Sequence, residues 1–145
     1  MEKKTIDHVL RSTWQAVSKM YNDQANKYNS TMAVGFALLS IDPKNGTPST
    51  SLGPKMGIEA TSLSRTLKSM EEKKFIHRKP NPDDGRGVLI HLTELGKTNR
   101  DASRIAVKKF NQAIVDEAGT ESIENFYLVI EKINELTKKK NIFTF

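Results

Sequence analysis

The sequence predicts a mainly α-helical fold with one small β-hairpin (α+β). Apolar residues recur at three- and four-residue spacings along most of the 145 residues, which is the period of an amphipathic helix. Only residues 75–80 (FIHRKP) and 88–93 (VLIHLT) change to short β-branched or aromatic runs. A turn-rich segment joins these two runs. The length is that of one domain, so we expect a single domain over residues 1–145.

The N-terminal third predicts two helices. The first runs to about Asn29 along an apolar stripe that begins at Ile6. The second covers residues 31–41 (TMAVGFALLSI), and the preceding Asn29 and Ser30 are its expected N-cap region. Residues 42–48 (DPKNGTP) then break the helical pattern with turn-forming side chains.

The centre of the chain predicts two short helices separated at Gly57. Pro54 has no amide hydrogen, so we expect it in the first turn of the earlier helix or at a bend in that helix. Residues 81–87 (NPDDGRG) then connect the two strands, with glycine at permissive positions. The apolar stripe of the later helix consists of Leu63, Leu67 and Met70.

Two more helices are expected after the hairpin. Thr93 caps a long helix from about Glu94 to Glu117, and Gly119 ends it. Thr120 is the expected N-cap of the final helix. The apolar stripe of that helix consists of Ile123, Phe126, Ile130 and Ile133.

Composition restricts the class of protein. The absence of cysteine excludes disulfides, thiolate metal sites and thiol-based redox sensing. No run approaches the roughly 18 apolar residues of a membrane span, and the acid-containing N-terminus lacks the apolar segment of a signal peptide. We therefore expect a cytoplasmic protein without membrane contact. The net charge of +6 is concentrated in residues 47–100, where an anionic partner would dock.

Two short helices joined at a glycine and followed by a hairpin describe a winged helix-turn-helix. A helix with small polar side chains at its exposed start can enter a DNA major groove about 12 Å wide, while the hairpin reaches the flanking backbone or minor groove. The sequence therefore predicts a lobe over residues 33–100 that binds double-stranded DNA. Its candidate DNA-binding residues on the second helix are Ala60, Thr61, Ser62, Ser64, Arg65 and Lys68.

Three segments form an ordered pattern. Met70-Glu71-Glu72-Lys73 closes the helix-turn-helix, Asp84-Gly85-Arg86 lies in the wing, and Leu92-Thr93-Glu94-Leu95-Gly96 opens the long helix. In this order the segments resemble the MarR family of bacterial transcription regulators, and the resemblance covers nearly the whole chain. It implies a ligand-responsive repressor that acts as a homodimer on a pseudo-palindromic operator.

The resemblance also implies which parts of the chain form the dimer and the rest of the interface. Residues 1–30 and 101–145 would supply the dimerisation helices. Their apolar stripes and the apolar tail Asn141–Phe145 independently call for a partner surface. The further expected DNA contacts are Ser49, Thr50, Arg78, Lys79, Asp84 and Arg86.

The wing and its approach carry two specific expectations. Pro82 and Gly85 shape the turn and Asp83 is a solvated turn residue. By the resemblance, Asp84 pairs with Arg86 and orients it towards DNA. Residues 74–75 read Lys-Phe where the family commonly has a Lys-Gly-like pair, so a left-handed conformation at Lys74 would carry strain.

A small aromatic or anionic effector is also implied by the resemblance. The residues that could line its pocket are Trp14, Tyr21, Tyr28, Phe36 and Phe110, although their helical spacing favours ordinary core packing over a ligand pocket.

Two other function classes stay open. One is a winged-helix protein-interaction module without DNA binding, and the other is a small enzyme. His8, His77 and His91 lack the spacing of a catalytic triad or zinc site, and His77 and His91 are expected to face each other across the hairpin as a structural pair. Asp83-Asp84-Gly85 lacks the alternating ligands of a calcium loop. No catalytic residue, metal or cofactor is therefore predicted.

Overall fold

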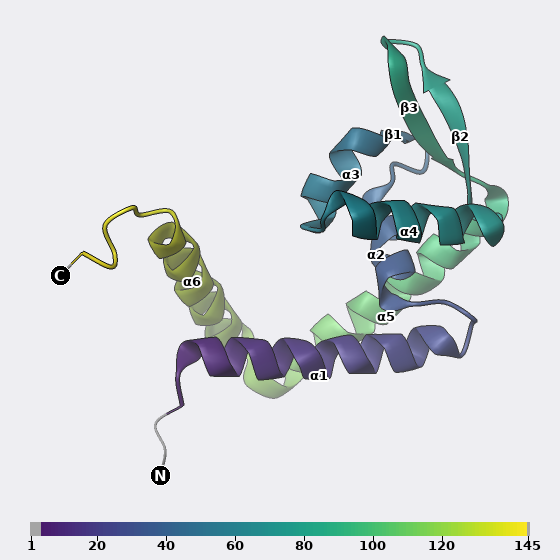
Figure 1. The fold of residues 1–145 in the computed structure, drawn as a ribbon. Coiled ribbons are helices and arrows are strands. Elements are labelled where there is room, and N and C mark those ends of the chain that lie inside the picture. Colours follow the sequence, from purple (N-terminus) through teal and green to yellow (C-terminus); the bar gives the residue numbers. More distant parts are fainter. Residues whose placement is uncertain (1–3, 145) are drawn as a thin grey trace. The chain divides into compact units, whose positions relative to one another are not determined.

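The structure is a computed structural model that describes residues 4–144, apart from the side chain of Arg86. Contacts divide the chain into two units, Met1–Arg104 and Ile105–Phe145. The expected fold class is confirmed, because helices dominate and the sheet is small (Figure 1). The elements are α1 (Ile6–Asn26), α2 (Met32–Ser40), β1 (Thr47–Pro48), α3 (Ser49–Met56), α4 (Ala60–Glu72), β2 (Ile76–Asn81), β3 (Asp84–Leu92), α5 (Glu94–Ala118) and α6 (Thr120–Thr137).

The hydrophobic core lies among α2, α3, α4 and the base of the sheet. The predicted stripe of α4 is confirmed, since Leu63, Leu67 and Met70 are all buried. Helix α2 is apolar on most faces, which suits its place at the centre of the first unit. The buried cluster comprises Val34, Ala37, Leu38, Ile41, Leu52, Leu63, Leu67, Met70, Phe75, Ile76, Ile90 and Leu92.

Helices α3 and α4 are separated at Gly57, as predicted. Gly57 adopts a left-handed conformation (φ 65°), and its amide donates to the carbonyls of Gly53 and Pro54, which ends α3. The expectation that Pro54 lies in the first turn is wrong. Helix α3 starts at Ser49, directly after β1, so Pro54 lies near its end. Proline lacks the amide hydrogen that would continue the helical bonding, and α3 ends two residues later at Met56.

The N-caps are confirmed for one helix and wrong for two. Thr93 caps α5, since its Oγ1 accepts a hydrogen bond from the Gly96 amide at 3.0 Å. Helix α2 is capped by Thr31, whose Oγ1 accepts from the Val34 amide, and not by the preceding Asn29 or Ser30. Thr120 is the first residue of α6. The N-cap of that helix is Gly119, which has no side chain to accept a bond.

The three strands form one antiparallel sheet in the order β1-β3-β2. Strand β1 has only two residues, too few to show a sequence period, and the sequence analysis did not predict it. It pairs Thr47 with Ile90, which places the start of α3 beside the base of the wing. In Figure 1, β2 and β3 project from the helices as a narrow hairpin.

The tip of the wing differs from the expectation for Gly85. Asn81 pairs with Asp84, so the turn consists of Pro82 and Asp83 and Gly85 already belongs to β3. Asp83 is exposed, and its amide donates to Asn81 Oδ1 at 3.0 Å. Asparagine forms this local bond readily, and the turn closes without glycine.

A register shift follows the turn. Pro80 pairs with Val88 whereas Asn81 pairs with Asp84, so β3 has three residues, 85–87, where β2 has none. The backbone of Arg86 is therefore carried on an irregular, widened part of the hairpin.

The left-handed conformation is present at Lys74 (φ 60°). It lets the Phe75 amide donate back to the Met70 carbonyl at 2.9 Å, which closes the end of α4 and turns Phe75 into the core. The carbonyl of Lys74 also accepts a hydrogen bond from Thr93 Oγ1 at 2.6 Å. The backbone here is fixed from both sides, and a residue other than glycine is held at positive φ.

The wing base contains the predicted histidine pair. His77 and His91 occupy paired positions on β2 and β3, and their rings stack with centroids 5.5 Å apart. The His91 ring lies against Gly46, where an added Cβ would be 2.7 Å from Cε1. Burial, together with the positive charges of Lys79 and His77, lowers the pKa of His91 below its ordinary value of 6.5.

We expect acid to weaken the fold through His91. Because the pKa is lowered in the folded state, the unfolded chain binds the proton more readily, and stability is lost as pH falls from about 7 through 6.5 and below. Urea unfolding midpoints measured between pH 7 and 5 should fall more steeply for the wild type than for His91→Gln. Equal pH dependence in the two proteins would contradict this expectation.

Candidate nucleic-acid interface

Helix α4 carries its exposed polar side chains in three rows around the buried stripe. Residues spaced by three or four share a row, so Thr61, Arg65 and Lys68 lie together on the side away from the core. Ala60 and Ser64 lie on one flank of this outer row. Ser62 lies on the other flank, where its carbonyl accepts a hydrogen bond from Thr66 Oγ1 at 3.0 Å.

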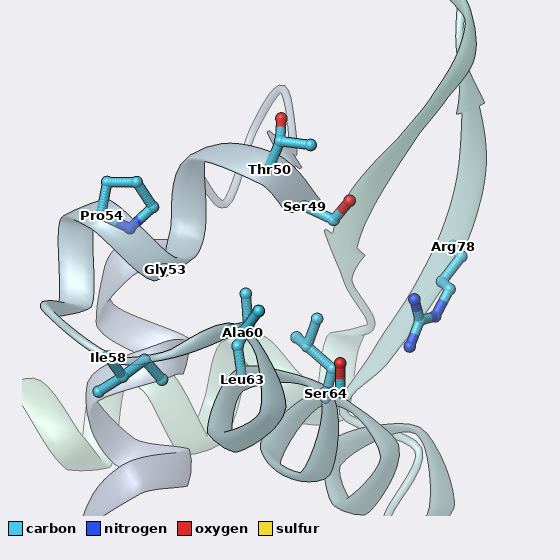
Figure 2. A pocket seen from close by; sticks show the side chains of 10 residues that line it. Ser49, Thr50, Gly53, Pro54, Ile58, Ala60, Leu63, Ser64 and Arg78 are labelled. Atoms are coloured by element: carbon cyan, nitrogen blue, oxygen red, sulfur yellow. The ribbon is translucent and has the colours of Figure 1, made fainter.

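The flank of Ala60 and Ser64 faces a hollow between α3, α4 and β2. This hollow has a volume of about 330 Å³. Figure 2 shows Ser49 at the start of α3, Ser64 on α4 and Arg78 on β2 arranged around the same space. Five predicted DNA-binding residues from three separate segments therefore line this hollow: Ser49, Thr50, Ala60, Ser64 and Arg78.

Arg78 is held by an ion pair that the sequence analysis did not identify. Its Nε donates to Oε1 of Glu71, which lies in the last turn of α4 on the same row as Ala60 and Ser64. Both side chains are 41% exposed, so the pair lies at the surface. The sequence contained the two residues but no local signal of the contact, because it joins a helix to the following strand.

Lys79 does not join Arg78. Side chains alternate across a strand, so adjacent Arg78 and Lys79 point to opposite faces of β2. Lys79 lies with the histidine pair, where its charge acts on His91. The sequence analysis placed both cations in one DNA-binding set, and the structure gives that set two faces.

Asp84 is exposed at the start of β3, and its carboxylate lies over the backbone of Gly87. An added Cβ at Gly87 would be 3.2 Å from Asp84 Oδ2 and 3.3 Å from Asn81 Cβ. Glycine therefore allows the aspartate to fold against the widened part of the wing. The proposed contact of Asp84 with Arg86 involves a side chain outside the described residues and stays a prediction.

Two of the five aromatic residues expected around an effector are in contact within the first unit. Tyr21 on α1 and Phe36 on α2 meet edge to face, with ring centroids 5.8 Å apart. Trp14 and Tyr28 are 55% and 65% exposed, and Phe110 belongs to the second unit. The effector pocket stays a prediction.

The described residues form neither a metal site nor a membrane span. In residues 4–144, no three side chains of the histidine, cysteine, aspartate or glutamate type come close enough together to hold a metal ion. Across the same part of the chain, no helix combines the length and apolar character of a membrane span.

A second long-range contact joins α4 to the turn after α1. Lys73 Nζ donates to the backbone carbonyl of Asn29, which has a positive φ of 55°. Nearby, Asn22 Oδ1 accepts a hydrogen bond from the Met32 amide at 2.9 Å. The Lys73 bond fixes the connection between α1 and α2 against the end of α4, and the Asn22 bond joins α1 to the start of α2.

The helix pair, the hairpin wing and the polar rows together define a winged helix-turn-helix protein. The chain matches the model of the MarR family over residues 31–88. Over 126 residues it is 26% identical to the HTH-type transcriptional regulator SarZ of Staphylococcus aureus, covering 86% of this chain and 85% of that protein.

Solved structures of low sequence identity share the fold. The S. aureus MepR–DNA complex aligns with a TM-score of 0.83 at 19% identity, covering 92% of this chain and 98% of that one. The reduced form of MarR from E. coli aligns with a TM-score of 0.74 at 21% identity, with the same coverage of both chains. These likenesses confirm the winged-helix fold.

Proposed function

We propose that this chain is a sequence-specific double-stranded DNA-binding transcription regulator. The observation that carries the proposal is the exposed polar and cationic surface of α3, α4 and β2, built on a helix-turn-helix whose core is buried. The relative SarZ is a transcriptional regulator and the similar MepR was solved with DNA, which supports the same function here.

In the proposed complex, the start of α4 enters the major groove. The outer row of Thr61, Arg65 and Lys68 faces the bases and the adjoining phosphates, with Ser62 at its edge. Ser49, Thr50 and Arg78 contact the DNA backbone beside this helix, and the wing residues Lys79, Asp84 and Arg86 reach the flanking groove.

The regulator acts as a homodimer in this proposal. Of the described residues of α1 and α6, none is buried, and α6 exposes a run of large apolar side chains. Phe126, Tyr127, Leu128 and Val129 are each more than half exposed, which a second copy would cover. Residues 1–30 and 101–145 provide the dimer surface, and two-fold symmetry would place the half-sites of a pseudo-palindromic operator about 34 Å apart.

The dimer can be tested on α6. Phe126→Asp places a charge on the apolar stripe, so we expect monomers in analytical ultracentrifugation and a loss of operator affinity. Asn134→Asp adds the same charge at an exposed polar position of α6 and should leave the dimer intact. A dimer that persists in Phe126→Asp would exclude this surface.

A small aromatic or anionic effector would relieve repression in this proposal. Such a ligand can act only by binding the DNA-competent and incompetent dimers with different affinities. The edge-to-face contact of Tyr21 and Phe36 supplies aromatic surface for such a ligand. Titration of the DNA complex with benzoate, as an aromatic anion, should release DNA from the wild type and less readily from Phe36→Ala.

Salt dependence separates the proposal from a winged-helix module that binds only proteins. Neutralised phosphates release counterions, so DNA affinity should fall steeply as salt rises. Fluorescence anisotropy with a labelled duplex between 50 and 200 mM salt, a range of about fourfold, measures this slope. A flat response would favour the interaction module.

A further inference from the structure

We propose that Glu71 is a positioning residue that holds Arg78 ready for DNA. The inference rests on the proposed function, because it assigns a role within the same DNA-binding surface. It starts from the ion pair between Arg78 Nε and Glu71 Oε1, which joins the last turn of α4 to β2.

Arg78 lies in the lining of the hollow, whereas Glu71 lies outside the lining. Arg78 lines the hollow together with Ser49, Thr50 and Ser64. Glu71 lies seven residues after Ser64, two turns along the same row of α4, and is absent from the lining. In Figure 2 the Arg78 guanidinium is directed towards α4, alongside Ser64.

The bond geometry leaves the arginine able to bind an anion. Nε supplies the donor to Glu71, and the two Nη atoms at the end of the guanidinium carry four further N–H donors. A guanidinium held at one edge can present its other donors to a phosphate oxygen as a charge-assisted bond. The hydroxyls of Ser49, Thr50 and Ser64 around the same hollow can donate to the same phosphate group.

The Arg78–Glu71 ion pair is expected to contribute little to the stability of the folded protein. Both side chains are 41% exposed, and ion pairs this exposed contribute little to folding. An acid beside a DNA-binding surface also repels phosphate. The pair becomes useful if it restricts the many rotamers of arginine before binding, because that entropy is otherwise lost when the complex forms.

The two possible effects of Glu71 have opposite signs. If its negative charge dominates, Glu71→Gln tightens DNA binding. If positioning dominates, Glu71→Gln weakens binding by about 3- to 10-fold, the cost of ordering one flexible side chain. We expect the weakening.

Glu72 provides a matched control. It lies in the same turn of α4, is exposed, and has no ion-pair partner in the part of the chain that the structure describes. Glu72→Gln removes the same charge from the neighbouring outer row, four residues after Lys68, so it should bind DNA as tightly as the wild type or more tightly.

The experiment measures the affinity of the full-length dimer for a duplex selected from random DNA, by anisotropy at several salt concentrations. Glu71→Gln should bind DNA about 3- to 10-fold more weakly than Glu72→Gln. Its affinity should depend on salt as steeply as that of the wild type, because Arg78 still reaches its phosphate. In an Arg78→Ala background, Glu71→Gln should cause no further weakening. Thermal unfolding of each variant shows that the fold is retained.

Three results would overturn the inference. They are equal affinities for Glu71→Gln and Glu72→Gln, tighter binding by Glu71→Gln, and a weakening that persists in the Arg78→Ala background. If the wild type itself bound no duplex, the proposed function would fail and the inference with it. If the wild type bound DNA and the Glu71 variants bound it with the same affinity, the inference would fail and the proposed function would stand.

Discussion

Gly96→Ala is expected to destabilise the winged-helix lobe severely. Gly96 is buried in the first turn of α5, and an added Cβ would lie 2.0 Å from the Phe75 carbonyl oxygen and 2.9 Å from its carbon. The same oxygen accepts a hydrogen bond from the Thr93 amide at 3.0 Å, so it cannot move away without loss of that bond. We expect the free energy of unfolding to fall by about 3 kcal/mol or more, measured by urea denaturation.

Helix propensity predicts the opposite sign for the same change. Alanine favours a helix by about 1 kcal/mol over glycine, so a stabilised Gly96→Ala protein would contradict the close contact. Gly85→Ala is the control, because a Cβ there meets nothing within 4 Å and the backbone φ is not in the left-handed region. That variant should unfold within about 0.5 kcal/mol of the wild type.

Arg65→Ala is expected to have the largest effect on sequence recognition. Arg65 is exposed on the outer row of α4, one turn after Thr61, where a guanidinium can contact a guanine with two hydrogen bonds. Loss of such a contact costs about 1–3 kcal/mol of discrimination and relaxes one position of the operator. Comparing selected sequences for the wild type and Arg65→Ala would show which position loses its preference.

Lys68→Ala separates base recognition from phosphate contact on the same row. Lys68 on the third turn of α4 should contact the DNA backbone, so this variant should weaken binding to all sequences alike and reduce the salt slope by about one unit. An unchanged consensus for Arg65→Ala would show that Arg65 does not read a base.

The elements that the sequence predicted well are those whose signals are local. The stripe of Leu63, Leu67 and Met70 repeats at the helical period, and Gly57 meets the left-handed conformation that ends α3. The hairpin and the Thr93 cap likewise depend on residues close in the chain. Such signals identify the fold class without knowledge of tertiary contacts.

The features that the sequence did not predict are of two kinds. Some depend on residues that are distant in the chain, and others on a choice between neighbouring residues that suit the same position equally well. Strand β1 exists because Thr47 pairs with Ile90, and the Arg78–Glu71 and Lys73–Asn29 contacts join different elements. The cap of α2 was assigned to Asn29 and Ser30 because asparagine, serine and threonine cap helices about equally well. Tertiary packing selected Thr31.

The candidate site shows the same division. The exposed residues of α4 follow from helical spacing, and their separation into rows follows from the same period. The separation of Arg78 from Lys79 follows from strand alternation, but the sequence alone did not show which face of β2 turns towards α4. Their contacts with DNA stay predictions.

Selection of bound duplexes from random DNA, followed by anisotropy across a salt series, tests the central claim most directly. We expect a two-fold symmetric consensus with half-sites about one helical turn apart, and an affinity that falls steeply with salt. No enrichment of any sequence, together with binding indifferent to salt, would contradict the assignment of this chain as a DNA-binding regulator.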